Sequence, residues 1–185
     1  AYDRLIKNSD LDLYVSFNNV SVGEIQAQNI LDKYPTGDYI LVGGSPSDNN
    51  AVLVRDGQMN VLKANIDKGD IKVIADKWAD GWNPEIAYKD VKDILASSDN
   101  KNLKAIVTSN DGCAGGVVKA LKEKGMDGKV GVSGQDADLA ACQRIVEGTQ
   151  TVTVYKPINF LAGKVAELAV SFAKKESVQT DDKVN

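Results

Sequence analysis

The stretch VGVSGQDADLA, residues 130–140, places acidic side chains directly after an apolar, strand-like run. The β-branched pattern breaks at Gly134. Gln135, Asp136 and Asp138 follow before an apolar, helix-like pattern resumes. Carboxylates at such a junction can cap the next helix, hold a metal ion, act as acid and base, or grip a ligand. The segment by itself leaves these alternatives open.

The composition narrows the chemistry, because the chain contains no histidine. This removes His-based acid–base catalysis, Ser-His and Cys-His nucleophile pairs, and His metal sites. Cys113 and Cys142 are too few and too far apart for a zinc cluster. We expect them to be small buried packing residues, with a disulfide between neighbouring helices as the alternative. A net charge of −4 without a basic stripe argues against a nucleic-acid partner.

Strand-like and helix-like segments alternate along the chain, and this alternation must position the polar residues. The strand-like runs are residues 12–17, 38–44, 71–76, 104–109, 129–134 and 150–156. Helical periodicity covers 22–34, 52–66, 85–97, 114–125, 139–148 and 159–175, and the tail 176–185 reads as loop. Gly69, Gly125 and Gly148 mark expected helix ends. The alternation predicts an α/β fold with a Rossmann-like parallel sheet flanked by helices.

Polar side chains follow each predicted strand, where ligands of open parallel α/β sheets bind. Structural roles are the alternative, because Asn and Asp cap helices, Trp82 can cover a core edge, and Lys156 before Pro157 can be a solvated strand end. Capping, however, does not require Arg, Lys and Trp among these residues. The candidate ligand contacts are Asp3, Arg4, Asn50, Trp82, Asn110, Asp136 and Lys156.

This set of side chains suits a neutral polyhydroxyl ligand. Carboxylates such as Asp136 accept hydrogen bonds from hydroxyls, whereas Arg4 and Lys156 donate them. A Trp face can pack against the C–H side of a sugar ring. Paired acids and bases leave the site near neutral, which favours a neutral ligand over an anion. Within the opening stretch, Asp136 is the expected hydroxyl acceptor and Asp138 the expected helix cap.

Competing chemistries have weaker support in the sequence. Neither GxxxxGK[ST] nor GxGxxG occurs, and the glycines of GCAGG have the wrong spacing for a phosphate cradle. The segment DADLA is too short for an EF-hand loop. A two-carboxylate glycosidase site that uses Asp136 or Asp138 is an open alternative, although polar residues at every strand end favour binding over hydrolysis. We expect a binding protein that is not an enzyme and needs no cofactor.

Several segments together resemble a known family. They are AYDRLI, LYVSFNN, GGSPSDNNA, GQMNVLK, DGWNPE, TSNDGCAGG, SGQDAD and TQTVTVYKPI. In this order and spacing they resemble the xylose branch of the type I periplasmic sugar-binding proteins, which serve ABC importers, and the likeness covers essentially the whole chain. The resemblance implies two Rossmann-like lobes with D-xylose bound in the cleft between them. It also implies that the seven candidate residues contact the sugar, with Trp82 stacked on the pyranose.

The resemblance further implies a division of the chain into lobes. Residues 17–154 should form a complete C-terminal sugar-binding lobe, whereas 1–16 and 155–185 should belong to the hinge and to part of the N-terminal lobe. Family members carry a further half-lobe ahead of the YDR segment. We therefore expect a chain truncated at its N-terminus, with a second chain or further sequence supplying the rest.

The implied partners are a monosaccharide, most simply D-xylose, and an ABC permease that recognises the closed lobes. A membrane sensor, either a histidine kinase or a chemoreceptor, is the alternative recipient of the signal. The implied location is periplasmic or extracellular, with a lipoprotein anchor as one form of it. The effector domain of a sugar-responsive repressor is a further alternative, although the chain shows no basic helix-turn-helix.

Overall fold

The computed structural model describes residues 1–97 and 100–180 and contains two compact units. The larger unit is Asn18–Lys156. The smaller unit combines Ala1–Phe17 with Pro157–Asn185. The extended sheet belongs to the larger unit.

The larger unit is built around a parallel, four-stranded sheet with the order β2-β1-β3-β4. The strands are β1 (Gly37–Gly43), β2 (Ile71–Trp78), β3 (Leu103–Thr108) and β4 (Gly131–Val132). The central strands β1 and β3 are buried along most of their length, as expected for apolar runs covered on both faces. The predicted α/β fold with a parallel sheet flanked by helices is confirmed.

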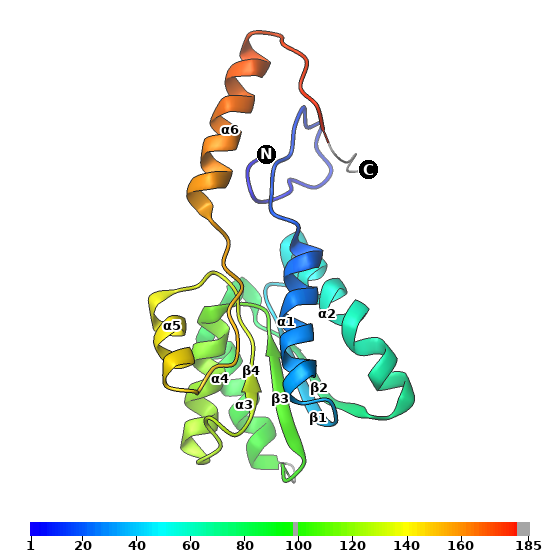
Figure 1. Cartoon of the computed structure of the whole chain (residues 1–185), viewed down its shortest axis with the longest axis vertical. Helices are drawn as coiled ribbons and strands as arrows, with labels where there is room; N and C mark the ends of the chain where they lie inside the picture. The colour runs from blue at the N-terminus through cyan, green and yellow to red at the C-terminus, as the bar shows by residue number, and fades with distance from the viewer. Residues whose placement is uncertain (98–99, 181–185) are drawn as a thin grey trace. The chain divides into compact units, whose positions relative to one another are not determined.

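Helices cover both faces of this sheet (Figure 1). They are α1 (Asn19–Lys33), α2 (Asn49–Lys68), α3 (Pro84–Ser97), α4 (Asp111–Glu123) and α5 (Leu139–Val146). The side chains of Tyr39 and Leu41 point from β1 into the core beneath α1 and α2. Ile40 and Val42 point to the opposite core, beneath α3 and α4. Alternate residues of one strand therefore feed two separate hydrophobic cores.

The helices α1 and α2 approach each other until their backbones meet. A Cβ atom added to Gly57 would overlap the carbonyl oxygen of Val20, and one added to Gly23 would overlap that of Val54. Glycine at both positions therefore permits the close contact. This contact fixes the position of α2, which carries Asn50 in its first turn.

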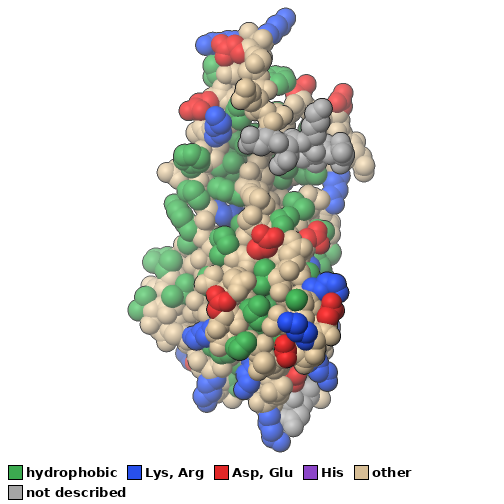
Figure 2. All heavy atoms as spheres, turned by 45° about the vertical axis from the view of Figure 1, so that its right-hand side comes forward, with side chains coloured by type: hydrophobic (Ala, Val, Ile, Leu, Met, Phe, Trp, Pro, Cys, Tyr) green, Lys and Arg blue, Asp and Glu red, His purple; other side chains and the backbone are tan. Residues whose placement is uncertain are grey.

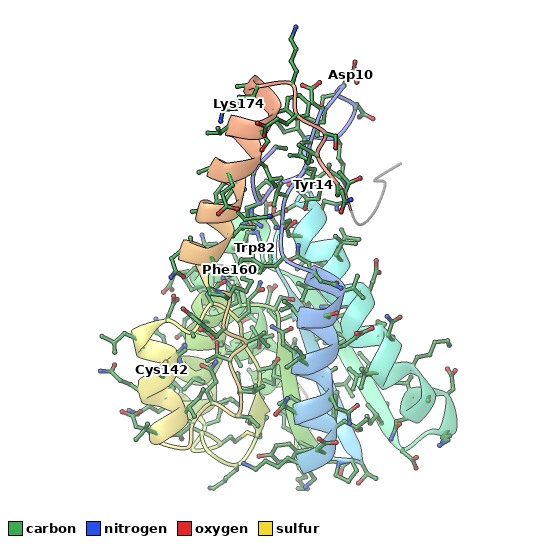
Figure 3. The ribbon with its side chains drawn as sticks, turned by 45° about the horizontal axis from the view of Figure 1, so that its top comes forward. Asp10, Tyr14, Trp82, Cys142, Phe160 and Lys174 are labelled. Atoms are coloured by element: carbon green, nitrogen blue, oxygen red, sulfur yellow. The ribbon has the colours of Figure 1, made fainter. Side chains whose placement is uncertain are left out.

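The smaller unit contains α6 (Ile158–Ala173), with Pro157 at the N-cap position. The expected strand at 12–17 is reduced to a single parallel bridge between Tyr2 and Val15. Several large apolar side chains of this unit are exposed, among them Phe160, which is 74% exposed and is labelled in Figure 3. None of the helices in the described part of the chain has the length and apolar character needed to cross a membrane.

The segment 150–156 also differs from the expected strand, because it forms only an isolated bridge between Gln135 and Val154. Backbone hydrogen bonds join the segment to Val132, Gly134 and Asp136. The amides of Val132 and Ala137, however, donate to the hydroxyls of Thr151 and Thr153 in place of backbone carbonyls. The segment therefore follows β4 without extending the sheet as a regular strand.

The three glycines predicted to end helices do so, with φ angles of 82°, 62° and 78° at Gly69, Gly125 and Gly148. Residues 176–180 have no regular structure, as expected for a loop, and residues 181–185 lie outside the described part of the chain.

Replacing Gly57 with Ala should destabilise the larger unit, even though Ala is the better helix former by about 1 kcal/mol. The new methyl group would overlap the Val20 carbonyl, and overpacking of this kind costs about 1–3 kcal/mol. We expect a lower midpoint of thermal unfolding by circular dichroism. Gly163 is the matched control, because a Cβ there meets no atom within 4 Å. Gly163→Ala should preserve or raise the midpoint, and an unchanged midpoint for Gly57→Ala would contradict the close approach.

Candidate functional site

The four strands are parallel, so the segments that follow them lie at one edge of the sheet, here called the carboxyl edge. Lys156 lies close to this edge, because the nearby Val154 bridges to Gln135, which follows β4. The structure therefore places five of the predicted contacts at the carboxyl edge or in the first turn of the adjoining helices: Asn50, Trp82, Asn110, Asp136 and Lys156.

Asp136 and Lys156 form an ion pair at this edge. The Lys156 Nζ atom lies 3.1 Å from Asp136 Oδ1, and the two side chains are 13% and 37% exposed, respectively. Partial burial reduces solvent screening of the pair relative to a fully exposed one. The pair therefore presents a fixed donor next to a fixed acceptor, with little net charge.

Trp82 ends the short helix η1 (Asp80–Trp82), just beyond β2, and is labelled in Figure 3. Its indole Nε1 donates to Asp48 Oδ2 at 2.9 Å. The ring also packs so closely on Gly44 that a Cβ atom there would overlap it. These two contacts fix the orientation of the indole. Asp48 and Gly44 are not among the contacts predicted from the sequence, although Asp48 stands at a recognisable N-cap position before α2.

The two predicted asparagines have different settings. Asn50 is 1% exposed in the first turn of α2. Asn110 is the N-cap of α4, and its Oδ1 accepts from the Cys113 amide at 3.0 Å. This capping bond uses the carbonyl oxygen of the amide, whereas the amide nitrogen carries two donor hydrogens. Capping and ligand binding are therefore compatible at Asn110.

The prediction that Asp138 caps its helix through its side chain is wrong. Asp138 occupies the N-cap position of α5, but its carboxylate makes no capping bond. Instead, its backbone amide donates to Asp111 Oδ2 at 3.0 Å. The carboxylate that holds this segment thus comes from α4, far away in sequence.

Asp111 is 1% exposed and has several donors around its carboxylate. Its Oδ1 accepts from Gln150 Nε2 at 2.9 Å, and its Oδ2 accepts from Thr153 Oγ1 at 2.8 Å as well as from Asp138. Burial raises the pKa of Asp111, and these hydrogen bonds oppose the rise. Arg144 completes the cluster by donating to the Asp111 carbonyl and to Gln150.

Asp111 is not among the ligand contacts predicted from the sequence. The available signal was the pair of consecutive polar residues in NDG, of which a single residue can serve as the N-cap. A second signal is Gly134, because a Cβ atom there would overlap Asp111 Oδ1 and lie 2.6 Å from Gln150 Nε2.

A second buried cluster joins the ends of β3 and β4 to the helices on one face. Gln26 Nε2 donates to the carbonyl oxygens of Ser109 at 2.9 Å and Gly134 at 3.0 Å. Gln58 Nε2 in turn donates to Gln26 Oε1 at 2.8 Å, and Arg55 donates to Gln58. The Gln26 amide therefore satisfies two backbone carbonyl groups that follow the strands, and Gln58 holds Gln26 in place.

Asp3 and Arg4 belong to the smaller unit. The Asp3 amide donates to the Val15 carbonyl at 2.8 Å. Arg4 Nε lies 3.6 Å from Asp3 Oδ2, and the two side chains are 53% and 27% exposed, respectively. The two predicted contacts are thus adjacent to each other within this unit.

The cysteines are both free, so they form no disulfide. Cys113 is buried as predicted, and burial raises the pKa of its thiol to about 12. Cys142 is exposed on α5, where Figure 3 labels it, so the prediction of a buried packing role is wrong there. The apolar pattern of the sequence does not show that this position of α5 faces solvent.

Figure 2 shows the charged side chains on one face of the molecule. Acidic and basic groups are interspersed over the face drawn in Figure 2. Within residues 1–97 and 100–180, no group of three or more acidic or cysteine side chains could hold a metal ion.

Comparison with known proteins adds independent findings. The model of the periplasmic binding protein domain matches residues 1–177. The D-xylose-binding periplasmic proteins of Escherichia coli (strain K12) and Haemophilus influenzae are 52% and 54% identical to the chain over 185 residues. The chain covers 56% and 55% of their lengths, so it spans about half of these curated relatives.

Solved structures give a similar picture. An ABC transporter solute binding protein from Clostridium phytofermentans, with bound β-D-glucose, is 31% identical with a TM-score of 0.88. The match covers 100% of this chain and 62% of that one. A carbohydrate transporter solute binding protein from Chloroflexus aurantiacus, in complex with D-glucose, is 26% identical with a TM-score of 0.89 and is covered to the same extents.

The raised pKa of Asp111 predicts how its contribution to stability depends on pH. The folded state binds this proton more tightly than the unfolded chain, where the ordinary pKa is 3.8. Between the two pKa values the folded state holds more protons, so the stability due to Asp111 rises as pH falls. Asp111→Asn removes this titration. The free energy of unfolding of the wild type minus that of Asp111→Asn should therefore increase from pH 7 towards pH 4 in urea titrations. A difference that does not change with pH would contradict the assignment.

Proposed function

The chain belongs to the periplasmic binding protein family, and from this premise we propose that it contains the sugar-binding lobe of a D-xylose-binding protein that serves an ABC importer. The two D-xylose-binding relatives align with its whole length. Members of this family bind solutes without turning them over, so the function is binding and not catalysis. We place the protein in the periplasm, like these relatives.

The ion pair between Asp136 and Lys156 is the observation that carries this proposal. A sugar hydroxyl is both donor and acceptor, so adjacent hydroxyls can donate to the carboxylate and accept from the ammonium group at once. The low net charge of the pair suits a neutral sugar. Its partial burial also strengthens hydrogen bonds to any ligand that displaces water from it.

The other contacts at the carboxyl edge supply apolar surface and orientation. Trp82 offers an indole whose orientation is fixed by Asp48 and Gly44. We propose that this ring stacks on the pyranose, because aromatic faces pack against the C–H side of sugars. Asn50 and Asn110 complete the proposed site with amides that both donate and accept.

Asp3 and Arg4 are proposed as sugar contacts on the strength of their sequence motif alone. We also propose that residues 17–154 correspond to one complete lobe, with 1–16 and 155–185 in the hinge and the other lobe. We propose that sugar binding closes the two lobes. A sugar that contacts both lobes binds the closed form more tightly and shifts the population towards it. The closed form is the one that an ABC permease would recognise.

Calorimetric titration of the full-length protein with D-xylose, D-ribose, D-glucose and L-arabinose tests the ligand assignment. We expect a sub-millimolar dissociation constant for D-xylose and weaker binding of the other three sugars. A clear preference for another sugar would refute D-xylose as the ligand. Failure to bind any of the four would refute the proposed function.

Trp82→Ala should weaken D-xylose binding about tenfold or more, because stacking and apolar burial by the indole are both lost. Trp82→Phe is the matched control, since it keeps an aromatic face but loses the Nε1 donor to Asp48. We expect an intermediate affinity for this variant in the same titration. If Trp82→Ala binds D-xylose as tightly as the wild type, the stacking role is rejected.

A further inference from the structure

The loop that carries Asp136 has an unusual backbone. Asp136 and Ala137 have φ angles of 101° and 53°. Residues with a Cβ atom rarely adopt positive φ angles, and two such residues with positive φ in succession are rarer still. Such a conformation persists only where the surrounding structure holds it in place.

Each backbone amide of this loop has a specific partner. The Asp136 amide donates to the Val154 carbonyl at 2.9 Å. The Ala137 amide donates to Thr153 Oγ1 at 3.1 Å, and the Asp138 amide donates to Asp111 Oδ2 at 3.0 Å. Two of the three bonds therefore depend on side chains.

The Thr153 hydroxyl links the Ala137 amide to the Asp111 carboxylate. Because it accepts from the Ala137 amide, its own hydrogen is available for Asp111 Oδ2, which lies 2.8 Å away. A hydroxyl has a single hydrogen and two acceptor lone pairs, and this arrangement uses the hydrogen and one lone pair. The Asp111 carboxylate, 1% exposed, is in turn fixed by Gln150.

We propose that Thr153 and Asp111 are positioning residues that hold the Asp136–Ala137 backbone in its left-handed conformation and thereby aim the Asp136 carboxylate at the sugar. Thr153 precedes Lys156 in the same segment, so one hydroxyl anchors the segments of both members of the ion pair. Holding the site in its binding geometry before the ligand arrives reduces the cost of ordering it on binding. This inference rests on the proposed sugar-binding function.

The test compares Thr153→Val with Thr153→Ser in the full-length protein, using D-xylose as the probe in calorimetric titration. Val keeps the branched shape but lacks the hydroxyl, whereas Ser keeps the hydroxyl. We expect Thr153→Val to weaken D-xylose binding about tenfold, because both hydrogen bonds of the hydroxyl are lost. Thr153→Ser should restore affinity to within about threefold of the wild type, since the bonds can re-form. Equal affinities of the two variants would overturn the inference.

A double-mutant cycle with Asp136→Asn separates positioning from a general loss of stability. If Thr153 acts through Asp136, Thr153→Val should weaken binding much less in the Asp136→Asn background than in the wild type. Equal factors in both backgrounds would show an effect that bypasses Asp136 and would overturn the inference. Thr153→Ala serves in the cycle if Thr153→Val does not fold.

The wild-type titration keeps the two proposals distinguishable. A wild type that binds none of the sugars overturns the proposed function, and the positioning role with it. If the wild type binds D-xylose and Thr153→Val binds it equally tightly, the positioning role alone is overturned.

Discussion

The geometry of the carboxyl edge depends on the hydrogen bonds that the buried carboxylate of Asp111 accepts. A carboxylate removed from water is costly unless its oxygens accept hydrogen bonds. Here the donors come from the loop that carries Asp136 and from the segment that leads to Lys156. Satisfying one buried charge therefore fixes two segments that are not neighbours in sequence. These two segments carry Asp136 and Lys156, which form the ion pair.

The rest of the larger unit supplies a rigid base for this arrangement. The buried amide of Gln26 donates to carbonyl groups just beyond β3 and β4, and Gln58 donates to Gln26. Backbone contact at Gly57 sets the position of α2. Asp48 then links the start of α2 to the indole of Trp82. The proposed binding residues thus lie on short loops or in the first turn of a helix, while regular elements and buried polar groups hold them in place.

The order of elements and their flanking glycines could be predicted from the sequence, because both depend on local periodicity and backbone preference. The position of five candidate residues at the carboxyl edge could also be predicted, because parallel strands end at the same edge of a sheet. The motif NDG marks Asp111 as a second polar residue beside the N-cap. Its partners Gln150 and Thr153, however, could not be predicted, since they lie about forty residues away in the sequence. The same reason explains the failure at Asp138, whose segment is held by a distant carboxylate in place of its own.

The segment 150–156 shows a different limit of sequence reasoning. Its run of four β-branched residues is typical of a strand, yet the hydroxyls of Thr151 and Thr153 accept hydrogen bonds from backbone amides. Side-chain bonds of this kind compete with a regular ladder. A polar residue with strand propensity can therefore serve the site instead of the sheet.

Binding of D-xylose at the carboxyl edge of the sheet can be measured by adding the sugar to the ¹⁵N-labelled full-length protein and following the backbone amide signals by NMR. Binding at this edge should give the largest shifts at Trp82, Asn110 and the loop that contains Asp136 and Ala137. Amides at the opposite edge, such as those of Ile71 and Leu103, should change little. The largest shifts at that opposite edge, with an unchanged Asp136 loop, would show that the sugar binds elsewhere.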